Sequence, residues 1–370
     1  MIITAEKIRK ELKNFLIYIQ IMTSLSTQRY NVIKNPKMKQ QLLDTYELLK
    51  EMDYNSLLLN GSTIKNNFQF LADYFLKKYP LKKSIDDIAS EFNEFFKSET
   101  NPFSTGIEFG WLESVMDISE KNYPLNLPYQ TKIGFGHHAG YASTEDEFLL
   151  RDSFYIFLKA EEVYKNLLKL RDVQKDKNDV IESNFDKDSY DKLNLLKFNI
   201  SAYSRLSIIS FYSFMECFVN TIGFDFYYRH KNNLGVKDSE ILKGKKKGRY
   251  LQLEYKLEKF PPIIREDKKQ IIFIKDDKQV KEPFKTFFQN YKNLRDSSVH
   301  YSPVKEKIWN SPFDWITKAR EFKNLTIDSA ILFWKACYPD SDGPEYLGKL
   351  DQKKQIELAE KRLKIDNEIN

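Results

Sequence analysis

Residues 206–224 read LSIISFYSFMECFVNTIGF and are apolar on almost every face of a helix. They lie within the longest helical pattern of the chain, from about 191 to 228. Thirty-odd helical residues span roughly 50 Å, the full height of a helical bundle. Because a helix that is apolar all round is buried, this segment is expected to be the central helix. Its apolar positions include Leu196, Ile200, Tyr203, Phe211, Phe214, Phe218 and Ile222.

The composition of the whole chain agrees with a helical protein. Its 370 residues include only 12 Gly and 12 Pro, but 28 Phe, 22 Tyr and 4 Trp. Such low Gly and Pro contents argue against linker-rich chains and turn-dense all-β folds. A hydrophobic content of 41% is too high for a disordered chain. The composition therefore predicts a soluble, all-α protein with a sizeable core.

The pattern divides into an N-terminal helical domain (1–120) and a linker or loop (121–145). In the first, apolar residues at helical spacing predict helices at 5–28, 36–52, 64–79, 85–96 and, less regularly, 111–119. In the second, Pro124, Pro128, Gly134, Gly136 and Gly140 interrupt any helical pattern. The linker is thus the expected boundary between two domains.

A second helical domain is predicted at 146–340, followed by a charged C-terminal helix at 341–370. Its helices are expected at 154–168, 191–228, 282–300 and 314–336, with the last one in the chain at 344–365. An insertion at 229–281 interrupts them. It contains Pro261-Pro262 and a predicted short hairpin at 271–277.

The residues that could build other common sites are scarce. Cys217 and Cys337 lie 120 residues apart, which excludes a disulfide framework or cysteine zinc site and predicts two buried, reduced thiols. His137-His138 has no third ligand at useful spacing, so no metal and no cofactor are expected. The longest uncharged run, 14–28, falls short of the ~18 residues of a membrane span. We therefore expect a cytoplasmic protein without membrane contacts.

The positive charge is concentrated in one part of the chain. Residues 231–300 hold 18 Lys and Arg against 10 Asp and Glu, a net charge of +8, whereas the rest sums to −2. Such a segment is either a solvated loop or the binding face for a polyanion, in which neutralised phosphates release counterions. The predicted RNA-binding residues are Lys243, Lys245, Lys246, Lys247 and Arg249.

The segment most suited to chemistry is RDSSVH at 295–300, at the end of a predicted helix and before Pro303. Arg295 supplies a guanidinium that can bind phosphate oxygens bidentately, and His300 an imidazole that transfers protons near neutral pH. Residues five apart on a regular helix lie about 140° apart. The two side chains can therefore converge only if the helix ends between them or two chains combine.

This segment resembles the Arg, polar residue, three residues, His motif of the HEPN superfamily (higher eukaryotes and prokaryotes nucleotide-binding). SFYSFMECFVN at 210–220 is similar to the aromatic-rich core helix of HEPN domains, which carries a glutamate and a following asparagine. The resemblance covers roughly residues 150–340. It implies a four-to-five-helix bundle that dimerises and, in catalytic members, a metal-independent endoribonuclease that often serves as a toxin or antiphage effector.

The resemblance assigns roles to individual residues. Arg295 would hold the scissile phosphate, His300 would act as general acid and base, and Asp296 would orient the pair or, alternatively, only pair with Lys292. Glu216, the one acid between Leu206 and Phe224, would pair with Arg295 or instead with Arg205. Asn220, one turn later, would hydrogen-bond on the same face or serve a structural role.

Three functions follow in order of preference. The first is an RNA-cleaving homodimer, a toxin or antiphage effector with an antitoxin or other defence-system partner. The second is a non-catalytic HEPN-like module that binds RNA, nucleotides or protein. The third is a helical scaffold whose aromatic residues serve only core and dimer packing.

Overall fold

A computed structural model describes residues 80–98, 104–108, 114–117, 132–136, 141–175, 187–299, 310–341 and 343–347, with shorter stretches and single positions elsewhere. The described residues are mostly helical, which confirms the predicted all-α fold class. The chain divides into two compact units, residues 1–145 and 146–370. Most of the helix predicted at 5–28, and all of the helix predicted at 36–52, lies outside the described residues.

In the first unit, helix α4 (Ile85–Ser98) matches the helix predicted at 85–96. Ser84 Oγ accepts a hydrogen bond from the Asp87 backbone N–H (3.1 Å), which satisfies one of the free donors at the helix start. The Glu91 carboxylate accepts bonds from Lys83 Nζ (2.6 Å) and Trp111 Nε1 (2.9 Å). These two bonds lower the pKa of Glu91.

The first unit also contains strands where the sequence predicts a helical domain and a loop. Strands β1 (Ser104–Glu108), β2 (Lys132–Gly136) and β3 (Tyr141–Thr144) form an antiparallel sheet in the order β1-β2-β3. Thr105 pairs with Phe135 and Ile133 with Thr144. Because β1 meets β2 across more than twenty intervening residues, no local pattern predicts this pairing.

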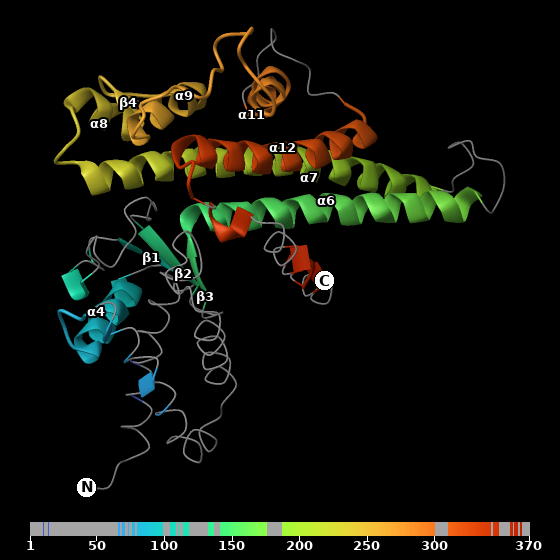
Figure 1. The fold of residues 1–370 in the computed structure, drawn as a ribbon. Helices are drawn as coiled ribbons and strands as arrows, with labels where there is room; N and C mark the ends of the chain where they lie inside the picture. The colour runs from blue at the N-terminus through green and yellow to red at the C-terminus, as the bar shows by residue number, and fades with distance from the viewer. Residues whose placement is uncertain are drawn as a thin grey trace, which may run out of the picture. The chain divides into compact units, whose positions relative to one another are not determined.

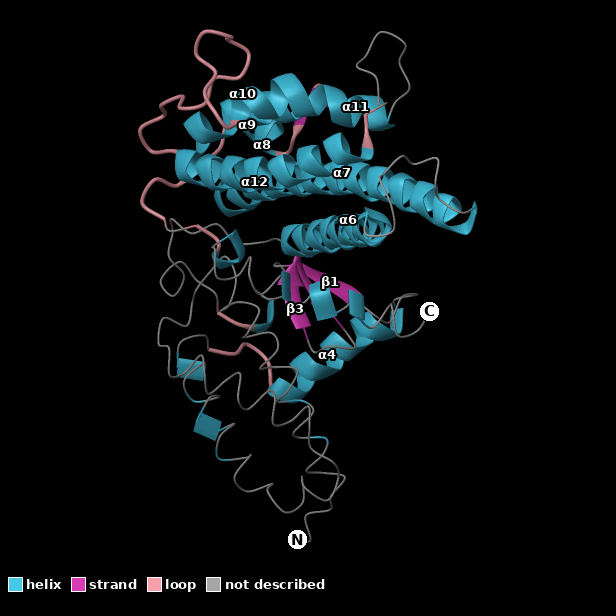
Figure 2. Ribbon diagram, turned by 90° about the vertical axis from the view of Figure 1, so that its right-hand side faces the viewer, coloured by secondary structure: helices cyan, strands magenta, loops and turns pink. Residues whose placement is uncertain are grey.

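The second unit is built on three long helices. They are α6 (Glu145–Lys175), α7 (Lys187–His230) and α12 (Pro312–Cys337). Arg205 lies over the Trp315 ring, and Phe218 packs against Phe333 and Trp334, so α7 and α12 run in the same direction. Helix α6 covers one face of this pair, whereas α8, α9 and α11 cover the other (Figures 1 and 2).

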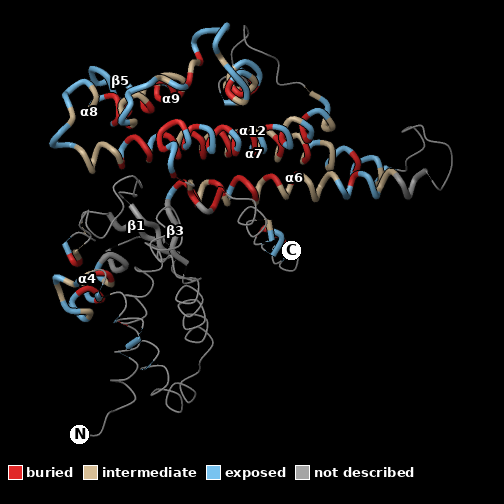
Figure 3. Tube along the Cα trace, viewed as in Figure 1, coloured by how far each residue is buried: buried red, intermediate tan, exposed pale blue. Residues whose placement is uncertain are grey.

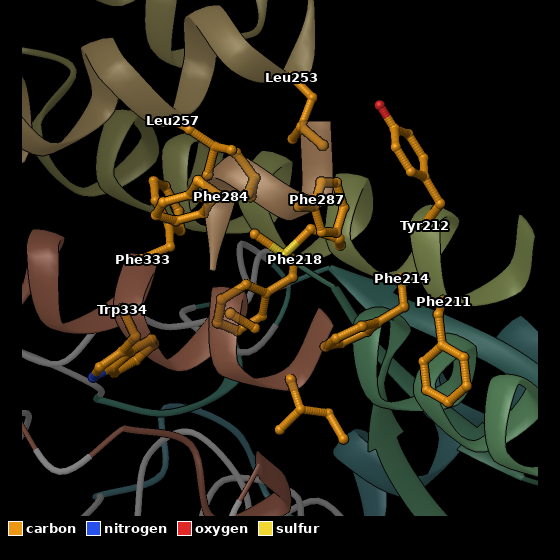
Figure 4. Close-up of a cluster of buried hydrophobic side chains, with 14 of the residues drawn as sticks. Phe211, Tyr212, Phe214, Phe218, Leu253, Leu257, Phe284, Phe287, Phe333 and Trp334 are labelled. Carbon is orange, nitrogen blue, oxygen red and sulfur yellow. The ribbon is translucent and has the colours of Figure 1, made fainter. Parts of the chain in front are cut away.

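Helix α7 is the central helix, as its sequence predicts. Phe211, Phe214, Phe218 and Ile222 are fully buried, and the buried positions lie along both α7 and α12 (Figure 3). Phe218 packs against Phe333 and Trp334 of α12, and Tyr212 stacks on Phe287 of the segment before α11 (Figure 4). By length and composition α7 could cross a membrane, but its apolar side chains are mostly covered by the bundle. Such burial is consistent with the core helix of a soluble protein.

The basic insertion at 229–281 contains helices and strands of its own. It contains α8 (Val236–Leu242), strands β4 (Lys245–Lys246) and β5 (Arg249–Tyr250), and α9 (Leu253–Ile264). The hairpin is therefore present in the insertion but lies at 245–250, not at 271–277. Lys247 and Gly248 form its two-residue turn with φ of 50° and 77°, which is the geometry that a tight hairpin favours.

Residues 271–274 form no strand, and α9 binds the backbone at the end of this segment. The buried Glu258 carboxylate accepts hydrogen bonds from the N–H groups of Ile274 (2.7 Å) and Lys275 (2.8 Å). In a hairpin, such backbone N–H groups would instead donate to carbonyl oxygens of the neighbouring strand. The segment consequently lies along α9, with Ile272 and Ile274 in the core.

Candidate functional site

A stripe of three polar-tipped residues lies along one face of α7. Tyr212, Glu216 and Asn220 are spaced four residues apart, so they follow one another along the helix. Tyr212 is buried and stacks on Phe287, whereas Glu216 is half-buried and Asn220 is exposed. Figure 4 shows the Tyr212 hydroxyl directed away from the aromatic cluster. The stripe therefore runs from the core to the surface and faces α9 and α11.

Arg295 on α11 (Asn293–Val299) lies against this stripe. Its Nη1 donates to Asp296 Oδ1 (2.8 Å), its Nη2 lies 3.7 Å from Glu216 Oε2, and its Cζ lies 4.6 Å from the centre of the Tyr212 ring. Two carboxylates and an aromatic face thus fix the guanidinium. The Arg295 side chain remains 24% exposed, and Asp296 accepts a hydrogen bond from one of its five N–H donors, whereas Glu216 contributes an ion pair.

The charges around Arg295 also shift pKa values. Burial disfavours the charged guanidinium, but the bond to Asp296 and the charge of Glu216 outweigh this effect and raise the pKa of Arg295. The pKa of Tyr212 is raised by burial and by the charges of Glu216 and Glu254. At neutral pH the site therefore presents a permanent cation beside a protonated phenol.

Helix α9 contributes two further contacts to the same region. Glu254 forms an ion pair with Lys292, and Lys256 Nζ donates to Asn220 Oδ1 (2.7 Å). Lys256 is only 8% exposed, and burial lowers its pKa, partly opposed by the charge of Glu216. These contacts link α9 to the segment before Arg295 and to the outer end of the α7 stripe.

A π-helix positions Arg295. Residues Phe287–Lys292 (η2) form this wider turn immediately before α11. Tyr291 uses its ring to stack on Phe322 and its hydroxyl to donate to Glu321 (2.6 Å). With Phe287 and Tyr291 held in the core, Lys292 and Arg295 face α9 and α7. Such π segments occur frequently at functional sites, and periodicity in the sequence does not reveal them.

The predicted RNA-binding residues lie on the β4–β5 hairpin and at its entry. Lys243, Lys245, Lys246, Lys247 and Arg249 are all exposed. The base of the hairpin at Gly244 (φ 71°) packs against the α9–α7 contact, since a Cβ there would lie 3.3 Å from Lys256 Cε and 3.8 Å from Asn220 Oδ1. The basic hairpin is thereby joined to the face of α7 that carries Glu216.

The structure shows which of the alternative charge pairs predicted from the sequence are formed. Glu216 pairs with Arg295, and Arg205 lies over Trp315. Asp296 binds Arg295, while Lys292 reaches Glu254. His300, the residue directly after Val299, lies outside the described residues. His137 and His138 also lie outside them.

Three residues of the site were not predicted from the sequence: Tyr212, Glu254 and Lys256. Tyr212 could have been found by its four-residue spacing from Glu216, whereas Glu254 and Lys256 carry no local signal. Lys292 was considered only as a partner of Asp296.

Comparisons with known proteins identify no relative. The sequence matches no protein-family profile, no curated protein and no solved structure. Among the described residues, no three His, Cys, Asp or Glu side chains are grouped so that they could hold a metal ion. Cys217 and Cys337 are both reduced, and Cys337 is buried whereas Cys217 is half-buried.

Proposed function

We propose that this protein is a HEPN-type endoribonuclease that cleaves RNA by attack of a 2′-hydroxyl on the adjacent phosphorus. The observation that supports this most directly is the fixed position of Arg295 among Asp296, Glu216 and Tyr212, five residues before His300. A preoriented guanidinium can bind the non-bridging phosphate oxygens and stabilise the charge that develops on them. The exposed cations of the hairpin would bring the polyanion to this face.

In the proposed reaction the 2′-oxygen forms a bond to phosphorus while the bond to the 5′-oxygen breaks. His300 removes the 2′-hydroxyl proton, and an imidazolium protonates the leaving 5′-oxygen, either that of the same His300 or that of His300 in a second copy. Asp296 and Glu216 hold Arg295 in place. The products are a 2′,3′-cyclic phosphate and a 5′-hydroxyl. No metal ion or cofactor has a step in this proposal.

The geometry of α11 bears on how the two groups meet. Residues 293–299 are helical, so a catalytic pair within one chain requires the helix to end directly after Val299. Otherwise Arg295 of one copy works with the imidazole of a second copy, which is the arrangement that a homodimer provides. The proposal includes such a homodimer in the cytoplasm, acting as a toxin or antiphage effector with an antitoxin or defence-system partner.

The test is cleavage of total RNA in EDTA by the wild type, Arg295→Ala and His300→Ala. We expect the wild type to release cyclic-phosphate ends and both variants to lose at least about a hundredfold in rate, the lower range for general acid–base catalysis. Arg320→Ala is the matched control, because Arg320 also pairs with a carboxylate, Glu161, and lies over a tyrosine ring, that of Tyr164. Wild-type cleavage rates in a folded His300→Ala protein would refute the assignment.

The second candidate is a non-catalytic RNA-binding module. The observation that favours it is the exposed basic hairpin, which needs no catalytic group in order to bind phosphates. It predicts salt-dependent RNA binding without any product in the same assay. Absence of both binding and product would leave only the scaffold function.

A further inference from the structure

One exposed aromatic ring lies among the cations of the hairpin. Tyr250, on β5, is 80% exposed and is paired with Lys245 across the two strands. Lys245 Nζ lies 5.1 Å from the centre of its ring. With so much of its surface in water, the ring contributes little to the core.

Further tyrosines at the base of the hairpin are paired with lysines in the same way. Tyr255 lies 5.8 Å from Lys246 Nζ and 5.2 Å from Lys275 Nζ, measured from the ring centre. Lys243 Nζ lies 4.2 Å from the centre of the Tyr227 ring. The hairpin region thus combines aromatic rings with cations that neutralise phosphates.

We infer that the β4–β5 hairpin is a single-stranded RNA site in which a base stacks on Tyr250 while Lys245, Lys246 and Arg249 neutralise the flanking phosphates. Stacking on exposed aromatic rings within a basic surface is how proteins hold single strands without reading their sequence. Paired bases inside a duplex are already stacked and cannot present a face to the ring. This inference rests on the proposed function, for which it names the form of the substrate.

The fold connects this site to Arg295. Gly244 at the base of the hairpin lies against Lys256 and Asn220, and Asn220 is one helical turn from Glu216, about 6 Å along α7. A strand stacked on Tyr250 can therefore continue over the α7 stripe toward the guanidinium. The hairpin would set which phosphate reaches Arg295.

A membrane surface is the other polyanion that a basic hairpin could meet. An interfacial anchor needs a set of apolar side chains on one face. Apart from Tyr250, the residues of the two strands and their turn are Lys, Arg and Gly. The composition of the hairpin thus favours RNA.

The experiment measures binding separately from cleavage. The probe is a mixed-sequence 20-nucleotide 2′-O-methyl RNA, which cannot undergo 2′-hydroxyl attack, used single-stranded and annealed to its complement. We expect Tyr250→Ala to lose about tenfold or more in affinity for the single strand and less than twofold for the duplex. Tyr250→Trp should retain the single-strand affinity.

Tyr190→Ala is the matched control, since Tyr190 is also exposed but lies near the other end of α7 and should not affect binding. Unchanged single-strand affinity of folded Tyr250→Ala would overturn the inference, as would equal losses for single strand and duplex. Tyr250-dependent binding to phosphatidylserine vesicles in place of RNA would also overturn it. If Tyr250→Ala loses binding while the wild type never cleaves unmodified RNA, the stacking site stands and the ribonuclease proposal fails.

Discussion

Arg295 is held in place by groups of opposite charge. Asp296 is its sequence neighbour, but Glu216 comes from α7, nearly eighty residues earlier, and approaches to 3.7 Å. A guanidinium balanced in this way keeps one orientation, although its net attraction for a phosphate is reduced. The balance predicts opposite effects on binding and on cleavage when one carboxylate is neutralised.

Glu216→Gln is the variant that tests this balance. It should leave RNA affinity unchanged or higher, because a negative charge is removed, and should lower the cleavage rate up to about tenfold because Arg295 is less firmly held. The Glu216 side chain is 41% exposed, so solvent screening limits the effect. Single-turnover rates and binding constants measured side by side separate the two quantities. A parallel loss of affinity and rate would contradict a positioning role.

Lys256 gives a prediction about pH. Because burial lowers its pKa in the folded protein, the unfolded chain binds more protons between the lowered pKa and the usual lysine pKa of 10.5. The stability contributed by this residue therefore rises as the pH increases through that interval. Lys256→Met lacks the ionisable group.

The measurement is chemical denaturation of wild type and Lys256→Met across alkaline pH. The free energy of unfolding of the wild type, relative to that of Lys256→Met, should increase as the pH is raised toward 10.5. If this difference does not vary with pH, the pKa of Lys256 is the same in the folded and the unfolded protein, which contradicts the prediction.

At the scale of elements, the second unit depends on a close approach between α7 and the insertion. A Cβ at Gly223 would overlap the Phe260 ring of α9 and would lie 2.8 Å from the Leu242 carbonyl oxygen of α8. Only glycine permits this distance. The contact positions α8, and with it the hairpin, against the outer half of α7.

Gly223→Ala should therefore destabilise the protein by about 1–3 kcal/mol, the usual cost of overpacking a well-packed core. Gly235→Ala is the control, because nothing lies within 4 Å of a Cβ at that position; its cost, about 1 kcal/mol or less, comes only from replacing the glycine N-cap of α8. Thermal or urea unfolding measures both. Equal stability of the two variants would show that α8 can move away from α7 at little cost.

At the scale of the whole molecule, the distribution of charge predicts how RNA binding responds to salt. Each phosphate neutralised on a single strand contributes about −0.7 to the slope of log K against log salt concentration. If all five hairpin cations contact phosphates, the slope is about −3.5. Lys245→Gln combined with Lys246→Gln should make it shallower by about 1.4.

Titrations of the 2′-O-methyl probe at several salt concentrations measure these slopes. Lys187→Gln combined with Lys192→Gln removes the same charge from exposed positions at the start of α7 and should leave the slope unchanged. If both double variants change the slope equally, binding follows net charge and the hairpin has no special role.

The sequence by itself determined the all-α fold class, the central position of α7 and the extents of α4 and α12 to within a few residues. These follow from periodicity and from apolar content, which are local properties. It also singled out Arg295, Glu216 and the basic segment, because charged residues in unusual surroundings are visible in the sequence.

Only the tertiary structure decided which of these residues meet. The pairing of β1 with β2, the capture of the 274–275 backbone by Glu258 and the contacts of Tyr212, Lys256 and Lys292 join residues that are distant in sequence. The hairpin lies at 245–250 because Lys247 and Gly248 adopt positive φ there, while α9 binds the donors of the competing segment. Local propensity selects helices, but long-range packing and the pairing of buried polar groups place the side chains of a site.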